Sequence, residues 1–131
     1  MHDKTTVLFL CVHNAGRSQM AAGWMRQLAG DAVDVFSGGS DPGPAVDPTA
    51  VEVMAEVGID ISSHTPRPWT PEDIRAADVV VTMGCGDECP VIPGRRYEDW
   101  ELTDPAGQPI EVVRAVRNDI EGRVRRLLTS L

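Results

Sequence analysis

Apolar and polar positions alternate along the chain at two spacings, which divides it into candidate strands and helices. Short runs that are continuously apolar or strictly alternating are typical of strands. Apolar positions repeating every three to four residues are typical of helices packed on one side. The predicted strands are 6–11, 33–37, 78–83 and a segment around Trp100. The predicted helices are 18 to about 29, 47–57, a short one from about 70, and one from about 110 onward.

Local signals mark the ends of these helices. Gly30 and Gly58 follow the first and second helices as stop signals, and Asp47-Pro48 opens the second. The run 70–73 supplies a cap, a proline at the first helical position and an acidic third residue. The apolar face predicted for the last helix consists of Val113, Val116, Ile120, Val124, Leu127 and Leu131.

Strands separated by helices predict an α/β fold. We expect one domain over residues 1–131, with a four-stranded parallel sheet covered by helices on both faces. Sheets of this kind bind ligands beyond the carboxyl ends of their strands. Cys11, Gly84 and Asp104 all follow predicted strands and therefore fall at that edge.

Composition narrows the function classes. The 131 residues carry a net charge of -8, from 12 basic and 20 acidic residues, which argues against a nucleic-acid partner. No apolar run is long enough to span a membrane, and the first residues lack the features of a signal peptide, so we expect a cytoplasmic protein. The 3 cysteines, an odd number, indicate chemistry or metal binding in place of a disulfide framework.

The strongest chemical signal lies between the first strand and the first helix. Cys11 ends the strand and Arg17 closes the loop that follows. Backbone N–H groups in such a loop can surround a tetrahedral anion, the new helix presents its positive end, and the guanidinium adds a bidentate clamp. The same field favours the thiolate form of Cys11, which is the nucleophile. The predicted anion-binding residues are Val12, His13, Asn14, Ala15, Gly16, Arg17 and Ser18.

Several residues near this loop allow two interpretations. Ser18 is either a cap of the first helix or a hydroxyl donor to the Cys11 sulfur. For Cys11 itself, the second interpretation is an inert cysteine at the end of a buried strand. His13 is either a base or a side chain that points to solvent. Asp104 is either a general acid for a leaving oxygen or a turn residue before Pro105.

Cys85 and Cys89 follow the third predicted strand and so lie near Cys11. A pair at this spacing is compatible with structural zinc, but the further ligands would have to be Cys11, His13 or His64. Inert buried thiols are a second interpretation. The third is a resolving pair that accepts a disulfide from Cys11 by exchange and passes two electrons to the active site. We predict no metal and no cofactor.

With these residues in place, the chain resembles the thioredoxin-coupled arsenate reductases built on the low-molecular-weight protein tyrosine phosphatase fold. The most specific motifs are 11–21, the Cys85 and Cys89 segment, and Trp100 with 104–107. The resemblance implies that arsenate binds in the loop, whose shape Asn14 holds through hydrogen bonds. It also implies that Cys11 attacks arsenic while Asp104 protonates the departing oxygen.

The resemblance further implies an order for the other thiols. Cys85 would attack Cys11 to release arsenite, and Cys89 would then take over the disulfide and present it to a dithiol reductant. That reductant would be thioredoxin, or a small thiol with its own redoxin. The chain departs from the family in the short spacing between these cysteines. It also has Ala22 and Arg67 where some members place acidic residues around potassium, so the resemblance is not extended to that ion.

Two other functions stay open. A tyrosine phosphatase would use the same Cys11, Arg17 and Asp104, although phosphatases of this fold usually place aromatic residues where this chain has Ala106 and Gly107. A non-catalytic thiol sensor that binds arsenite or zinc would explain the cysteines. It would leave the arginine and the aspartate without a role.

Overall fold

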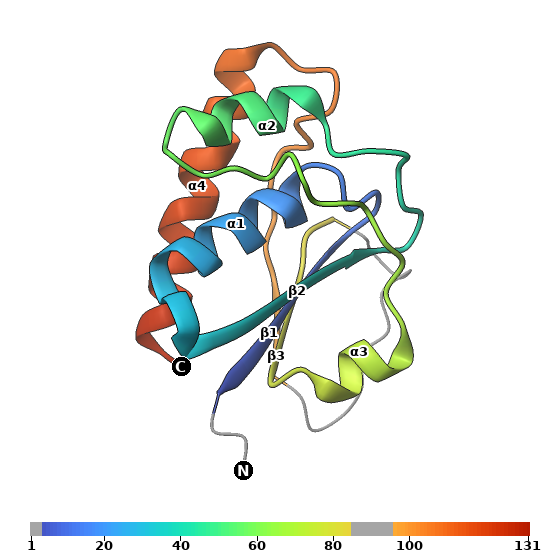
Figure 1. Ribbon diagram of the computed structural model, residues 1–131, viewed down its shortest axis with the longest axis vertical. Helices are drawn as coiled ribbons and strands as arrows, with labels where there is room; N and C mark the ends of the chain where they lie inside the picture. Colours follow the sequence, from blue (N-terminus) through green and yellow to red (C-terminus); the bar gives the residue numbers. More distant parts are fainter. Residues whose placement is uncertain (1–3, 85–95) are drawn as a thin grey trace.

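The computed structural model describes residues 4–84 and 96–131, which form a parallel sheet with helices packed around it (Figure 1). The strands are β1 (Thr5–Cys11), β2 (Val33–Gly39), β3 (Val79–Thr82) and β4 (Arg96–Asp99). The helices are α1 (Arg17–Ala29), α2 (Pro48–Ala55), α3 (Pro71–Ala76) and α4 (Ile110–Thr129), with a short 3-10 turn, η1 (Gly30–Ala32), after α1.

The sheet has the order β2-β1-β3-β4, and all of its described pairs are parallel. This confirms the predicted four-stranded parallel sheet. The central strand β1 is an apolar run that is buried on both faces, as expected for a strand between two layers of helices. Cys11 pairs with Gly39 at the end of β2, and Leu10 pairs with Thr82 at the end of β3. The ends of three strands therefore meet at one edge.

Alternate residues of β1 face two separate cores, because successive side chains of a strand point to opposite faces. Phe9 joins the larger core with residues of α1, α2 and α4, and its ring lies 5.8 Å from that of Trp100. Leu8 and Leu10 face the smaller core, where Ile74 of α3 packs. Figure 1 shows α1, α2 and α4 on one side of the sheet and α3 on the other. Helices on both faces are thus confirmed.

Most predicted boundaries agree with the structure, and three expectations were wrong. Helix α2 ends at Ala55 and not at Val57. The N–H groups of Val57 and Gly58 donate to the carbonyls three residues before them, Met54 O and Ala55 O, as in a 3-10 turn and not as in an α-helix. Strand β4 ends before Trp100, whose side chain is instead part of the core. Leu131 lies beyond the end of α4 and is 41% exposed, so it does not extend the buried face.

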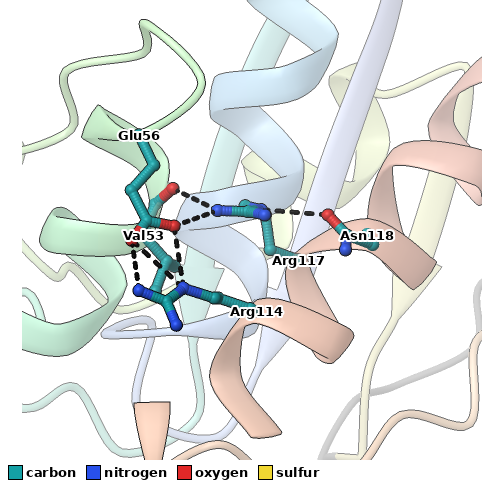
Figure 2. A network of polar contacts seen from close by, with 5 residues as sticks. All are labelled: Val53, Glu56, Arg114, Arg117 and Asn118. Atoms are coloured by element: carbon teal, nitrogen blue, oxygen red, sulfur yellow. Dashed lines mark hydrogen bonds and ion pairs between the residues drawn. The ribbon is translucent and has the colours of Figure 1, made fainter. Parts of the chain in front are cut away.

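Helices α2 and α4 are fastened together by an ion-pair cluster (Figure 2). Glu56 accepts hydrogen bonds from Arg114 and Arg117. Arg117, which is largely buried, also donates to the carbonyl of Val53 at 2.8 Å. The bonds from Arg114 and then Arg117 lower the pKa of Glu56 to about 2. This cluster holds α2 in place, and the first residues of α2 adjoin the Cys11 loop.

No helix within residues 4–84 and 96–131 has the length and apolar character needed to cross a membrane.

Candidate active site

The loop from Cys11 to Arg17 connects β1 to α1 and encloses the cysteine sulfur. Helix α1 begins at Arg17, and its cap position is Gly16, which makes no side-chain capping bond. The expectation that Ser18 caps the helix was therefore wrong, because Ser18 lies inside the first turn. Its hydroxyl Oγ is instead 2.9 Å from Cys11 Sγ. This is the alternative duty that the sequence left open.

Two hydrogen-bond donors converge on the sulfur. The backbone N–H of Asn14 donates to Cys11 Sγ at 3.2 Å. Asn14 Nδ2 donates to Ser18 Oγ at 2.7 Å, so the serine hydroxyl accepts there and is free to donate its own proton to the sulfur. A sulfur that accepts two bonds is better stabilised as the thiolate than as the thiol.

The carbonyl groups of the loop all have partners outside it. They accept as follows: Val12 O from Asp41 N, His13 O from Gly43 N, Asn14 O from Gln19 Nε2, Ala15 O from Asp47 N, and Gly16 O from Met20 N. In a trans peptide the C=O and the following N–H point in opposite directions. Carbonyls held outward therefore turn the N–H groups of the loop inward, where an anion can accept from them.

Asn14 is the bend that makes this arrangement possible. It has φ 51, a left-handed conformation that asparagine tolerates better than most residues, and it is fully buried. Its Oδ1 accepts from the backbone N–H of Arg67 at 3.0 Å and from Gln19 Nε2 at 3.3 Å. Sequence reasoning did not identify Gln19 as part of the site. The position of Gln19 directly after Arg17-Ser18 was the only available signal.

The loop, the residue before α2 and the segment after β4 surround a small hollow of about 40 Å³. Its lining residues are Cys11, His13, Ala15, Gly16, Arg17, Asp47, Asp104, Pro105 and Ala106. A cavity needs about 10–15 Å³ of such volume to hold one water molecule, so the hollow suits a small solute. Asp47 was expected only as the start of α2, where its Oδ1 does accept from Thr49 N at 3.0 Å. That it also lines the hollow is a finding of the structure.

Arg17 and Asp104 both line this hollow and pair with each other, with Arg17 Nη2 3.7 Å from Asp104 Oδ2. The arginine side chain is 9% exposed, whereas the aspartate side chain is 59% exposed. Asp104 Oδ1 also accepts from Ala106 N–H at 3.0 Å, which is a turn of the kind that Asp forms. The two interpretations of Asp104 are thus compatible: one oxygen makes the turn while the other faces the arginine.

His13 lies at the exposed side of the Cys11 loop, and Gly39 and Gly84 lie in close contact with residues of the loop. The exposed His13 ring bonds through Nδ1 to Asp41 O at 2.8 Å, which requires the proton on that nitrogen. A Cβ at Gly39 would lie 2.6 Å from Val12 O, and one at Gly84 would lie 2.5 Å from Arg17 Nη1. Both positions therefore need glycine for close approach.

The model of the low molecular weight phosphotyrosine protein phosphatase family matches residues 6–131. The chain belongs to this family. Arsenate reductase 2 of Staphylococcus haemolyticus is 40% identical over 131 residues, covering 97% of this chain and 98% of the relative.

Solved structures of the family agree with this match. A thioredoxin-dependent arsenate reductase of Corynebacterium glutamicum has a TM-score of 0.86 and 45% identity, covering 97% of this chain but 61% of that longer one. An arsenate reductase in the phosphate binding state has a TM-score of 0.84 and 39% identity, covering 96% of this chain and 98% of the other.

In this member of the phosphatase family, Cys85 and Cys89 lie outside the described residues. The described ranges, 4–84 and 96–131, contain no group of three or more His, Cys, Asp or Glu side chains able to hold a metal ion.

Proposed function

We propose that this protein reduces arsenate to arsenite. The observation that carries the proposal is the Cys11 sulfur, which accepts bonds from Asn14 and Ser18 at the base of a hollow that Arg17 and Asp104 enclose. The relatedness to arsenate reductases over nearly the full length of both chains supports the choice of arsenic over other oxyanion chemistry. We further propose that residues 1–131 act as one domain.

In the first step, arsenate binds to the inward N–H groups of residues 12–18 and to the Arg17 guanidinium. The Cys11 thiolate attacks arsenic and forms an As–S bond. An As–O bond breaks, and Asp104 gives its proton to the departing oxygen. Ser18 and Asn14 donate to the sulfur before the attack, so they stabilise the charge that the attack consumes.

In the second step, Cys85 attacks the Cys11 sulfur. The As–S bond breaks, its electron pair stays on arsenic, and arsenic leaves as arsenite while a Cys11–Cys85 disulfide forms. Cys89 then attacks Cys85 and returns Cys11 to the thiolate. A dithiol protein of the thioredoxin type reduces the Cys85–Cys89 disulfide, and the name of the Corynebacterium relative supports this choice over a small thiol. A cytoplasmic location would supply that reductant.

The test measures reductant consumption with arsenate, with thioredoxin and its reductase in one arm and a small thiol with its redoxin in the other. The wild-type protein should turn over in the thioredoxin arm. Cys11→Ser should abolish turnover and keep the fold, because a serine hydroxyl is a far poorer nucleophile at neutral pH. Turnover of the serine variant near the wild-type rate would remove Cys11 from this role.

The resolving cysteines are tested by what accumulates without each of them. Cys85→Ser should stop turnover, because the arsenic adduct on Cys11 then lacks an internal attacker. Cys89→Ser should release one equivalent of arsenite and trap a Cys11–Cys85 disulfide, which peptide mapping under non-reducing conditions detects. Multiple turnovers by both variants would indicate that electrons enter at Cys11 directly.

A tyrosine phosphatase is the second candidate, because the family description names phosphotyrosine as a substrate and the same hollow binds a tetrahedral anion. The hollow is lined by Ala106, where a phosphatase would be expected to use an aromatic side chain to hold a phenyl ring. Hydrolysis of p-nitrophenyl phosphate faster than arsenate reduction would favour this candidate. Binding of arsenite or zinc without turnover of either substrate would favour a thiol sensor.

A further inference from the structure

The side chain of Gln19 is 1% exposed, and its amide group is fully used. Nε2 donates to Asn14 O at 3.0 Å and to Asn14 Oδ1 at 3.3 Å, and Oε1 lies 3.2 Å from His64 Nδ1. The amide cannot be flipped, because a flip would place its oxygen against two acceptors. Arg26 Nη1, which can only donate, lies 3.5 Å from the same His64 nitrogen. Because the contact with Gln19 Oε1 is the shorter of the two and Oε1 only accepts, we assign the proton to His64 Nδ1.

These bonds form a chain in which each donor points toward the nucleophile. His64 Nδ1–H donates to Gln19, Gln19 donates to Asn14, Asn14 Nδ2 donates to Ser18, and Ser18 donates to Cys11 Sγ. Donors aligned in one direction polarise one another and strengthen the last bond of the chain. Gln19 also holds the Asn14 carbonyl outward, so that the next N–H, that of Ala15, faces the hollow.

We propose that Gln19 is a positioning residue that acts through Asn14 on both the Cys11 thiolate and the anion-binding loop, with His64 as the outer end of the chain. The proposal deepens the arsenate reductase function and rests on it for its kinetic consequences. Its effect on the reactivity of Cys11 does not depend on the substrate.

The charged groups around His64 do not reverse this chain. Burial, and then the positive charge of Arg26 on α1, lower the pKa of His64, while Asp60 raises it. Arg67 and Asp73, which pair at 2.9 Å, line a surface groove together with His64. A protonated His64 carries a proton on both ring nitrogens and donates from Nδ1 to Gln19, and in the neutral ring the shorter contact with Gln19 Oε1 favours the same direction over acceptance from Arg26 Nη1. The bonds from Gln19 to Asn14, from Asn14 to Ser18 and from Ser18 to Cys11 do not depend on the tautomer of His64.

The sharpest variant is Gln19→Glu, which has almost the same shape but lacks the donor when ionised. A buried carboxyl stays protonated to a higher pH than an exposed one, and its O–H can then replace Nε2–H as the donor to Asn14. The readout is the rate of Cys11 alkylation by iodoacetamide, resolved from Cys85 and Cys89 by peptide mapping. At pH 8 we expect the variant to react about tenfold more slowly than wild type. The ratio should return to within about twofold near pH 5.5.

Two further variants complete the experiment. Gln19→Met keeps the volume but has no donor, so its deficit should persist at every pH. Gln27→Glu makes the same change on the exposed face of the same helix and should match wild type throughout. Circular dichroism at each pH verifies that the proteins are folded. If the methionine variant does not fold, the alkylation rate of Gln19→Glu relative to wild type, compared between the two pH values, still tests the proposal.

A pH-independent ratio for Gln19→Glu in folded protein, or wild-type reactivity of Gln19→Met, overturns the proposal. The same variants are assayed for arsenate reduction, where kcat should fall with the alkylation rate and KM should rise. If the wild type does not reduce arsenate but the Gln19 variants lose alkylation rate with the predicted pH dependence, the positioning role stands and the proposed function is rejected. If the wild type reduces arsenate and the Gln19 variants are unaffected in both assays, the proposed function stands and the positioning role is rejected.

Discussion

Gly84 and Gly58 have the same backbone angle, φ 81, but different surroundings. A Cβ at Gly84 would lie 2.5 Å from Arg17 Nη1, whereas a Cβ at Gly58 would have no neighbour within 4 Å. A side chain at Gly58 would cause backbone strain alone, whereas a side chain at Gly84 would cause the same strain and also displace Arg17. At position 84, glycine makes room for the guanidinium that faces the hollow.

We predict that Gly84→Ala lowers kcat/KM for arsenate by roughly 10- to 100-fold, because a shift of about 1 Å in a positioning group can cost about 10²-fold. Gly58→Ala is the matched control, which should lose about 1 kcal/mol of stability from its positive φ but keep its activity within about twofold. Steady-state kinetics and thermal unfolding of both variants check this. Equal activity in the two variants would contradict the prediction.

Asp104 is the exposed partner of the buried Arg17, and its replacement separates proton donation from turn formation. Asparagine keeps an oxygen that can accept from Ala106 N–H, so Asp104→Asn should preserve the turn. We predict that it lowers kcat by about 10²- to 10⁴-fold, the usual range for a lost general acid. Pre-steady-state kinetics of arsenite release measure the effect. An unchanged rate and pH profile would leave Asp104 with the turn alone.

Between elements, the outer edge of β2 is protected by side chains from its neighbours. β2 is a terminal strand of the described sheet. Arg26 Nη2 of α1 donates to Val35 O at 3.2 Å, and Arg67 Nη1 donates to Ser37 O at 3.0 Å. Backbone acceptors on an edge strand invite pairing with another chain unless they are covered. The two arginines therefore cover two carbonyl groups of this edge and tie α1 and the segment around residue 67 to β2.

The contact between α2 and α4 depends on pH through Glu56. Its folded pKa of about 2 lies below the ordinary value of 4.5, so the folded state favours the carboxylate. The resulting stability is fully present above pH 4.5 and is lost as the pH falls toward 2. We predict that Glu56→Gln is less stable than wild type at pH 7. The difference should shrink as the pH falls through this window, as measured by urea unfolding.

Glu72→Gln is the control for this prediction, because Glu72 pairs with Arg75 on an exposed surface within one helix. Exposed pairs of this kind contribute little to stability. A pH dependence of Glu56→Gln equal to that of wild type would show that the α2 and α4 contact does not rest on this carboxylate.

For the whole molecule, anion binding in the Cys11 loop should appear as thermal stability. A ligand that binds only the folded state stabilises it by about 2.7 kcal/mol at 100 times its Kd. We predict a rise in Tm on the order of 10 °C with saturating phosphate compared with sodium chloride of equal ionic strength. Arg17→Met should lose most of this rise. An equal rise in that variant would assign the effect to general salt action.

The sequence by itself determined the order of the elements and the place of Cys11 at the end of the first strand. Strands such as β1 and β3 are continuous apolar runs, and Gly30, Pro48 and the capping box at Thr70 mark helix ends through their own backbone chemistry. These signals act over a few residues, so they can be recognised in the sequence without knowledge of the tertiary structure. The run from Cys11 to Arg17 belongs to the same class, because a loop of that length between a strand and a helix constrains its own shape.

Only the tertiary structure decided which residues support that loop. The Asn14 side chain meets the backbone of a residue 53 positions away, Arg67, because a bridge between Gly39 and Pro68 brings that segment beside the end of β1. The duty of Ser18 was settled in the same way. Its hydroxyl is a good helix cap in isolation, but the bend at Asn14 places it against the Cys11 sulfur. Such contacts depend on how distant segments pack, and local sequence carries no record of their distance in space.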